Sequence, residues 1–181
     1  MNDEPLHAAG YPSVELILSV DDADWNTILP DAARLAAEAA GAALSGAGMK
    51  PGLATEVGVT LADDEALRVL NGQWRGKDKP TNILSFPIVQ LTPGKAPGAM
   101  AGDLVLARQT LQREALRDGK PLADHFRHLV VHGMLHLLGY DHEEAEEAEQ
   151  MERLEVLVLS TLAIADPYAD SGGVAGVDPV D

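Results

Sequence analysis

Three closely spaced histidines in the segment VVHGMLHLLGYDH have the residue type and the spacing of a metal site. His132 and His136 are four residues apart, so on a helix both imidazoles would project from one face. Gly139 is the residue type that ends helices in the left-handed conformation, which would let the chain reverse and bring back His142. Three neutral imidazoles with a fourth position open are typical of catalytic zinc. The sequence therefore predicts one Zn2+ ion per chain.

Two further histidines, His125 and His128, precede this pair on the same predicted helix face. At about 1.5 Å rise per residue, His128 and His136 would be roughly 12 Å apart along the axis. Zinc–nitrogen bonds are only about 2 Å long, so those two residues do not share an ion. We therefore expect His128 to pack behind the ligands and His125 to lie at the surface.

The same spacing occurs in the metzincin proteases, whose signature has a glutamate directly after the first histidine. That glutamate is the general base that takes the proton from the metal-bound water. Gly133 stands at this position here, so peptide hydrolysis by that route lacks its base. A glycine inside a helix costs about 1 kcal/mol relative to alanine. We expect that Gly133 lacks a side chain because another backbone approaches closely there or because a bulky substrate needs room beside the ion.

The elements that must position these residues follow from the hydropathy pattern, which indicates a single domain over residues 13–165. Alternating and apolar runs predict four strands, at 13–20, 55–61, 82–86 and 103–107. Helical spacing predicts five helices, at 30–44, 63–74, 108–117, 122–138 and 143–165. The expected fold class is α/β, with α+β as the alternative: a small mixed sheet surrounded by helices, with the zinc site at the C-terminal end of the long apolar helix.

The remaining segments are predicted to be loops and terminal tails. Residues 90–102 form a Gly- and Pro-rich loop, which we expect to be the most mobile part of the domain. Residues 1–12 and the acidic stretch 166–181 are predicted to be flexible tails. The chain has no cysteine, which excludes disulfides and thiolate metal ligands. It shows neither a signal-peptide pattern nor a membrane-spanning apolar run, so we expect a cytoplasmic protein without a membrane partner.

The net charge of −16 argues at first against a nucleic-acid partner. The charge is unevenly distributed, however, since residues 62–130 carry a net +2 and the rest of the chain −18. The positive side chains thus gather just before the histidine segment. An uneven but ordinary solvated surface explains this distribution equally well.

Three segments together resemble the YbeY family of bacterial endoribonucleases. They are HGMLHLLGYDH at 132–142, NGQWRGKDKPTNILSFP at 71–87 and GDLVL at 102–106, and the resemblance covers roughly residues 14–160. The departures are peripheral: Trp74 stands where another aromatic such as tyrosine is more usual, the loop before Gly102 is rich in Gly and Pro, and the acidic tail is longer. The metal positions show no departure.

The resemblance implies a metal-dependent hydrolase of single-stranded RNA with a small mixed sheet. Its expected role is maturation of ribosomal RNA, notably the 3′ end of the small-subunit RNA, together with ribosome quality control. The expected partners are single-stranded ribosomal RNA and the small subunit or its assembly proteins. By position, His132, His136 and His142 would be the zinc ligands, and Arg75 would be the functionally important arginine.

The chemistry of phosphodiester cleavage agrees with that implication. A zinc ion can polarise a phosphoryl oxygen or activate a nucleophile, and a guanidinium can meet the developing negative charge. If the strand at 82–86 lies beside the metal, Arg75, Lys77 and Lys79 would line an RNA groove. Alternatively, Arg75 is a surface residue that pairs with Asp78. The general base stays unassigned.

Two other functions are open at this point. A metal-stabilised ribosome-assembly factor with little catalysis of its own would suit the acidic net charge. A metalloprotease is disfavoured by Gly133.

Overall fold

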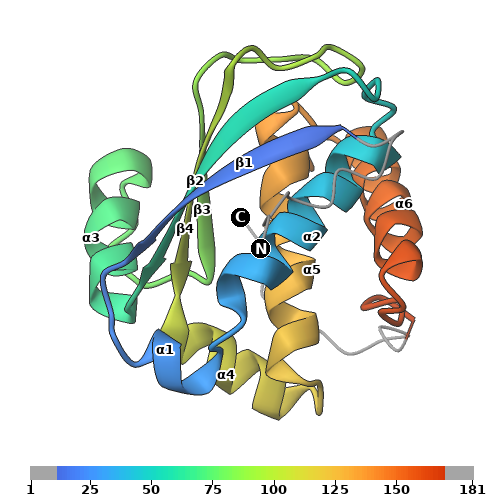
Figure 1. Ribbon diagram of the computed structural model, residues 1–181. Coiled ribbons are helices and arrows are strands. Elements are labelled where there is room, and N and C mark those ends of the chain that lie inside the picture. The colour runs from blue at the N-terminus through green and yellow to red at the C-terminus, as the bar shows by residue number, and fades with distance from the viewer. Residues whose placement is uncertain (1–11, 170–181) are drawn as a thin grey trace, which may run out of the picture.

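The computed structural model describes residues 12–169, which form a four-stranded sheet with helices on both faces (Figure 1). The strands are β1 (Ser13–Val20), β2 (Ala54–Ala62), β3 (Ile83–Pro87) and β4 (Met100–Ala107). The helices are α1 (Trp25–Ile28), α2 (Ala32–Gly46), α3 (Asp64–Arg75), α4 (Arg108–Arg117), α5 (Leu122–Leu137) and α6 (Ala145–Thr161). The predicted α/β class with a small mixed sheet is confirmed.

The sheet has the strand order β1-β2-β4-β3. β1, β2 and β4 are parallel, and β3 runs antiparallel to β4 along one edge. Parallel neighbours need a crossover connection, which α1 and α2 supply between β1 and β2. β3 is therefore an edge strand, and its outer side is not paired with another strand of this sheet.

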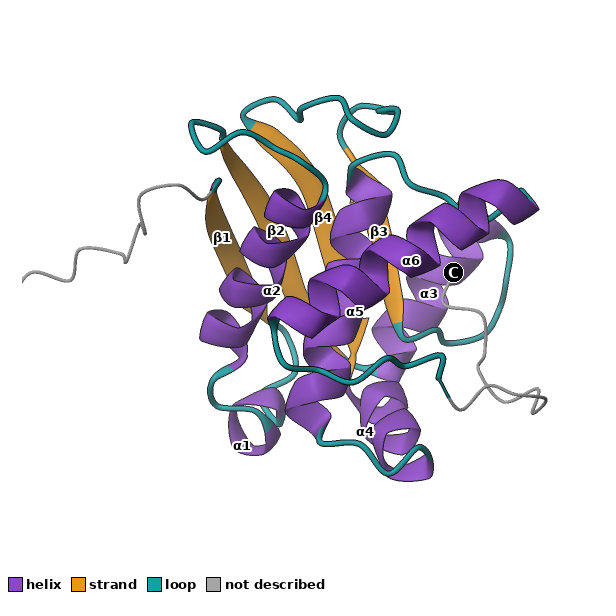
Figure 2. Cartoon of the chain, turned by 90° about the vertical axis from the view of Figure 1, so that its right-hand side faces the viewer, coloured by secondary structure: helices purple, strands orange, loops and turns teal. Residues whose placement is uncertain are grey.

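One face of the sheet is covered by several helices, of which α5 is the central one, and α5 lies between the sheet and α6 (Figure 2). It contacts α2, α4 and α6 as well as β3 and β4. Most of its side chains are buried, among them Phe126, Leu129, Val131 and Met134. A helix with this many apolar side chains is stable only when most of its surface is enclosed, so the composition of this segment explains its central place.

α3 covers the opposite face of the sheet near β3 and β4. Its Leu67 lies in a second, smaller core with Leu84 and Val105. Asp63 caps the start of the helix, since its carboxylate accepts a hydrogen bond of 2.9 Å from the Ala66 amide. It ends at Gly76, which has the left-handed φ of 66°. The sequence predicted this helix with nearly the same ends.

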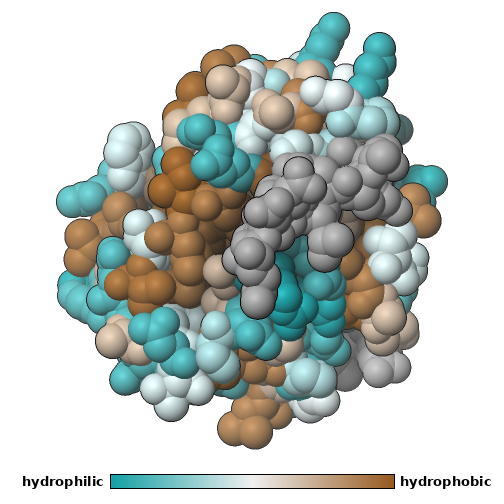
Figure 3. All heavy atoms as spheres, viewed as in Figure 1, coloured by the Kyte–Doolittle hydropathy of each residue, from teal (hydrophilic) through white to brown (hydrophobic). Residues whose placement is uncertain are grey.

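Edge strand β1 is less completely covered. Figure 3 shows an apolar area over this strand, and Ile17 is 50 % exposed there. The alternate residues Val14, Leu16 and Leu18 pack against the main core. The alternation of burial thus follows the pleat of the strand, as its sequence predicts.

Two helices differ from the prediction. The single-turn helix α1 was missed, because four residues are too few to show a helical period, yet its Trp25 is fully buried and donates a hydrogen bond of 2.8 Å to the Ala62 carbonyl. Helix α6 ends at Thr161, whereas the prediction extended it to 165. The chain reverses there through Ala163, which has a φ of 58°.

The predicted tails lie mostly outside the described residues. Pro12, assigned to the first tail, is buried at the start of β1. Residues 166–169, assigned to the second tail, fold back so that Tyr168 contacts side chains of α5 and α6. The packed part of the chain therefore continues past the predicted boundary at 165.

Candidate metal centre

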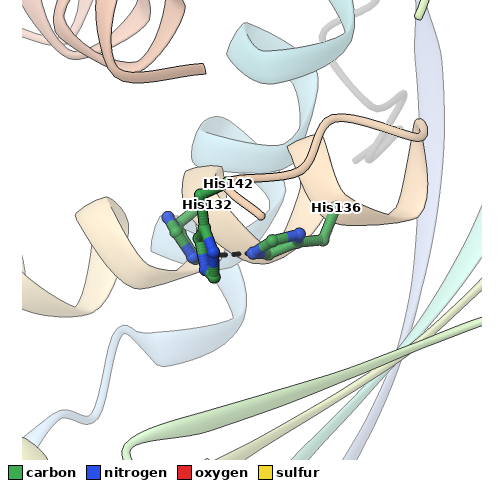
Figure 4. A group of neighbouring side chains, drawn as sticks. All are labelled: His132, His136 and His142. Carbon is green, nitrogen blue, oxygen red and sulfur yellow. Dashed lines mark hydrogen bonds between the residues drawn. The ribbon is translucent and has the colours of Figure 1, made fainter. Parts of the chain in front are cut away.

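The structure brings His132, His136 and His142 together at the C-terminal end of α5 (Figure 4). The first two lie one turn apart on the helix, and the third follows the turn after it. One nitrogen from each ring can be chosen so that all three lie within 4.8 Å of one another. Among the described residues, this is the group of His, Asp and Glu side chains arranged to hold a metal ion.

Gly139 makes this arrangement possible in two ways. Its φ of 95° lies in the left-handed region that favours glycine. A Cβ atom at this position would also lie 2.3 Å from the carbonyl oxygen of Leu91, in the loop between β3 and β4. The turn is closed by a hydrogen bond of 3.0 Å from the Tyr140 amide to the Leu135 carbonyl. The helix-ending role predicted from the sequence is confirmed.

The proton position on His132 follows from its partner. Its Nδ1 atom makes a short hydrogen bond to a carboxylate oxygen of Glu155, from α6. Burial raises the pKa of Glu155, but its interactions with His132 and His128 lower it by more, so that carboxyl is ionised. An ionised carboxylate only accepts hydrogen bonds, so Nδ1 of His132 carries the proton. Its Nε2 is left with a lone pair.

His136 has the same tautomer for a different reason. Its Nδ1 lies 3.0 Å from the backbone carbonyl oxygen of Tyr140, which is also only an acceptor. Nδ1 of His136 therefore donates, and its Nε2 keeps a lone pair. The two Nε2 atoms, of His132 and His136, are 2.9 Å apart. Two lone pairs face each other across this distance, and a cation between them removes the repulsion.

The protonation behaviour of His136 favours the same conclusion. Burial lowers its pKa to about 4, with smaller contributions from the neighbouring His132 and His142. The ring is therefore neutral near pH 7, as a metal ligand must be. His142 is one-third exposed, so one side of the group faces solvent. The donor set fits Zn2+ with one position left for water or substrate.

His128 lies behind the three grouped histidines, as the sequence predicts. Burial lowers its pKa, and its Nε2 lies 3.4 Å from Glu155. The same carboxylate accepts a short hydrogen bond from the Tyr168 hydroxyl. Burial and the nearby charge of Glu155 raise the pKa of Tyr168, so its hydroxyl stays protonated and donates.

Glu155 is the residue that sequence reasoning missed. It was included in the predicted last helix without a role of its own, although it is fully buried. One signal was present: Met151, Val158 and Leu159 define the buried face of this helix, and Glu155 falls on the same face. A carboxylate among such residues needs a partner inside the protein.

The expectation that His125 lies at the surface was wrong. Only 5 % of His125 is exposed, and its Nε2 lies 3.0 Å from a carboxylate oxygen of Glu114, on α4. Asn82 donates to the same carboxylate at 3.1 Å and accepts from the Ile83 amide at 2.7 Å. The face of α5 that bears His125 is covered by α4, which the helix pattern alone did not reveal.

Gly133 has a structural explanation that differs from the predicted one. The expectation of a nearby backbone or of room for a bulky substrate is not met. A Cβ atom here would instead lie 2.8 Å from Leu104 Cδ2, 2.9 Å from Ile83 Cδ1 and 3.2 Å from Ser85 Oγ. The space beside the helix is filled by sheet side chains. A glutamate base of the metzincin kind has no room at this position.

Asp141 also has a structural role. Its carboxylate accepts a hydrogen bond of 2.7 Å from the backbone amide of His142. The ring Nδ1 of His142 is 4.0 Å from the same oxygen, which exceeds hydrogen-bond length. Asp141 thus stabilises the turn that carries the third histidine.

Arg75 is the last residue of α3, on the face of the sheet opposite α5. The neighbouring Trp74 packs edge-on against Phe86 of β3, with ring centroids 5.8 Å apart. Phe86 pairs with Asp103, and the adjacent Gly102 approaches Leu137 of α5. The end of α3 therefore lies at the same end of the molecule as the histidines, across edge strand β3. Asp78, in the loop after α3, forms an ion pair with Arg68.

Many of the basic side chains between residues 62 and 130 form ion pairs within the protein. They pair with acidic residues of neighbouring helices and loops: Arg68 with Glu65 and Asp78, Arg108 with Asp22, Arg113 with Asp64, Arg117 with Asp118, and Arg127 with Glu38 and Asp124. Much of the positive charge gathered in this stretch is thus balanced internally.

Comparison with known proteins gives a consistent result. The family model described as endoribonuclease YbeY matches residues 19–163. The chain is 49 % identical over 156 residues to a protein of this name from Azorhizobium caulinodans, covering 86 % of this chain and 97 % of the relative. It is 45 % identical over 162 residues to the protein of that name from Sinorhizobium medicae, covering 87 % and 96 %. A third, from Rhodospirillum rubrum, is 48 % identical over 166 residues, covering 86 % and 83 %.

Proposed function

The chain belongs to the endoribonuclease YbeY family, and from this premise we propose that it is a zinc-dependent endoribonuclease whose ion is held by His132, His136 and His142. The observation that carries the proposal is that the Nε2 atoms of His132 and His136 lie 2.9 Å apart, while their Nδ1 atoms lie beside the hydrogen-bond acceptors Glu155 and the Tyr140 carbonyl. This arrangement is chemically suited to a cation.

Bound Zn2+ would act as a Lewis acid on a phosphoryl oxygen and would lower the pKa of a coordinated water. The residues of the chain supply the rest. His132 and His136 fix the direction of their lone pairs through Glu155 and the Tyr140 carbonyl. The exposed side of His142 leaves access for a flexible, single-stranded substrate.

Arg75 is proposed to bind the phosphate group of the RNA. A guanidinium stays charged and meets phosphate oxygens in a bidentate geometry, which stabilises the charge that develops in the transition state. Its position at the end of α3, across β3 from the histidines, supports this role. Lys77 and Lys79 follow it in the loop to β3 and would extend the contact along the strand.

The biological role proposed from the family resemblance is maturation of ribosomal RNA, with the 3′ end of the small-subunit RNA as the principal substrate, and ribosome quality control. The small ribosomal subunit and its assembly proteins are the proposed partners. None of the described helices is long and apolar enough to cross a membrane. A cytoplasmic location, where ribosomes are assembled, is part of the same proposal.

The test measures metal content and RNA cleavage together on the full-length protein. His136→Ala is expected to lose stoichiometric zinc and cleavage together. Arg75→Glu is expected to keep the zinc and lose at least 100-fold in cleavage rate, about the effect of removing one charge-stabilising donor. The charge-reversal control is Arg34→Glu on α2, whose ion pairs are largely exposed and which should cleave normally.

Three outcomes would contradict the proposal in different ways. Full cleavage by metal-free His136→Ala would exclude the metal mechanism. Cleavage by Arg75→Glu at the wild-type rate would exclude the role of Arg75. A wild-type protein that binds zinc and ribosomal subunits but leaves RNA intact would favour an assembly factor without catalysis.

A further inference from the structure

We propose that Glu155 and Tyr168 are positioning residues for the metal ligand His132. Glu155 accepts a hydrogen bond from Nδ1–H of His132 and thereby directs Nε2 toward the ion. Tyr168 donates to the other oxygen of Glu155 and holds it in place. The segment after α6 would then contribute to how tightly the metal is bound. The inference rests on the proposed metal site, but it does not depend on RNA cleavage.

The first argument is the burial of Glu155. No part of this side chain is exposed, and an unpartnered carboxylate inside a protein is strongly destabilising. Its two oxygens are instead divided between partners. One accepts from His132, and the other accepts from Tyr168 and, at 3.4 Å, from His128. These donors stabilise the negative charge of the buried carboxylate.

The second argument is what this carboxylate does to His132. A carboxylate on the outer nitrogen of a histidine ligand fixes the tautomer, orients the ring and increases the basicity of the inner nitrogen. His136 has only the neutral carbonyl of Tyr140 in the equivalent place. His132 is therefore the ligand whose affinity for a cation depends most on a charged neighbour.

The third argument is the position of Tyr168. Its ring packs edge-on against His128, with centroids 6.1 Å apart and an angle of 89° between the rings. Its hydroxyl donates to Oε2 of Glu155, whereas His132 contacts Oε1. Without this donor, the second oxygen would keep only the long contact to His128, and the carboxylate could rotate away from His132. Tyr168 thus acts on the ligand through Glu155.

The experiment measures the dissociation constant of Zn2+ by competition with a chromophoric chelator, using full-length protein first made metal-free. Glu155→Leu is expected to weaken zinc binding roughly 10- to 100-fold, which is the usual effect of losing such an outer partner. Glu155→Gln keeps an acceptor for His132 but loses the charge, so its affinity should fall between wild type and Glu155→Leu. Tyr168→Phe keeps the ring and should weaken binding about tenfold.

A matched control separates this effect from the general loss of a buried carboxylate. Glu114 is also buried and also pairs with a histidine, His125, at 3.0 Å. His125 lies seven residues before His132, or roughly 10 Å along the helix axis, so it does not touch the ion. Glu114→Gln should lower the melting temperature yet leave the zinc dissociation constant unchanged.

A second readout reports the geometry at the ion. With Co2+ in place of zinc, the visible absorption bands should shift in Glu155→Gln and stay unchanged in Glu114→Gln. The bands of Tyr168→Phe should shift in the same direction as those of Glu155→Gln. If Glu155→Leu does not fold, as judged by circular dichroism, Glu155→Gln and Tyr168→Phe still provide the comparison.

Two results would overturn the inference: zinc binding by Glu155→Gln and Tyr168→Phe as tight as in wild type, or an equal weakening by Glu114→Gln. A wild-type protein that binds no zinc would overturn both the inference and the proposed metal site. Zinc binding that depends on Glu155 in a protein that leaves RNA intact would support the inference and overturn the proposed activity alone.

Discussion

The two proposed ligand histidines of α5, His132 and His136, have unlike hydrogen-bond partners at their Nδ1 atoms. His132 donates to a carboxylate from another helix, whereas His136 donates to a backbone carbonyl only four residues further along the chain. The second partner is local and comes with the turn itself. The first depends on correct packing of α6 against α5. The orientation of His132 therefore depends on how α6 packs, whereas the orientation of His136 depends on the turn after α5.

The buried histidines predict a decrease in stability at acidic pH for the metal-free protein. Burial lowers the pKa of His128, and that of His136 to about 4, while an unfolded histidine titrates near 6.5. Below pH 6.5 the unfolded chain binds protons that the folded chain does not, so the free energy of unfolding falls between pH 6.5 and 4. Above pH 6.5 this contribution is constant.

Denaturant unfolding of chelator-treated protein at several pH values measures this effect. His136→Gln removes one titrating group and should show a smaller decrease than wild type over the same range. The carboxylates titrate equally in both proteins, so the comparison isolates the histidine. Identical pH dependence in the two proteins would show that His136 is already charged or exposed when folded.

The grouping of the three histidines could be predicted because their spacing is local, whereas the contact with Glu155 could not. Helix geometry alone places His132 and His136 on one face, and Gly139 signals the reversal. The contact between His132 and Glu155 spans 23 residues and depends on how two helices pack. His125 was misplaced for the same reason, because its partner Glu114 belongs to another helix.

At the scale of elements, local signals determined which ends were predicted correctly. Helix α3 has an acidic cap at its start and glycine at its end, and both of its ends were close to the prediction. Helix α6 lacks a glycine stop, since Ala163 adopts the left-handed conformation instead, and its end was predicted too late. The parallel order of the sheet depends on non-local pairing, which no short pattern in the sequence encodes.

Gly139→Ala is expected to lose both stability and metal affinity. The left-handed φ of 95° strains alanine by about 1–3 kcal/mol, and the added Cβ must also move the Leu91 carbonyl. The control is Gly119→Ala, which has a φ of 63° but nothing within 4 Å of the added Cβ. Thermal melts measure the loss of stability. Zinc titrations should show a loss of affinity only in Gly139→Ala. Equal zinc affinity in the two variants would mean that the turn does not position His142.

Gly133→Glu would restore the metzincin pattern in sequence but should not produce a protease. The new side chain meets Leu104, Ile83 and Ser85, and none of these neighbours carries a positive charge. We expect a loss of about 3 kcal/mol or more, as for other unpaired buried charges. Gly41→Glu on α2, where nothing lies within 4 Å, is the control that should fold normally. A stable, proteolytically active Gly133→Glu protein would contradict this account.

For the molecule as a whole, an ion bound by the three histidines would connect the end of α5 to the turn that follows it. A ligand at a concentration 1,000 times its dissociation constant stabilises the folded state by about 4 kcal/mol. In a chain of this size each kcal/mol raises the melting temperature by roughly 2–4 °C, so saturating zinc should raise it by roughly 8–16 °C. Calorimetry with and without chelator measures the shift. His136→Ala should melt at the same temperature in both conditions.

The position of Tyr168 also has a consequence for the order of synthesis. His142, the last of the three grouped histidines, is followed 26 residues later by Tyr168. At a translation rate of 5–20 residues per second this interval lasts roughly 1–5 s. A nascent chain thus contains the complete histidine set before Glu155 and Tyr168 exist to orient His132. Chains released early, between residues 142 and 155, would carry the three histidines but lack the carboxylate, so incomplete products should compete poorly for the ion with finished ones.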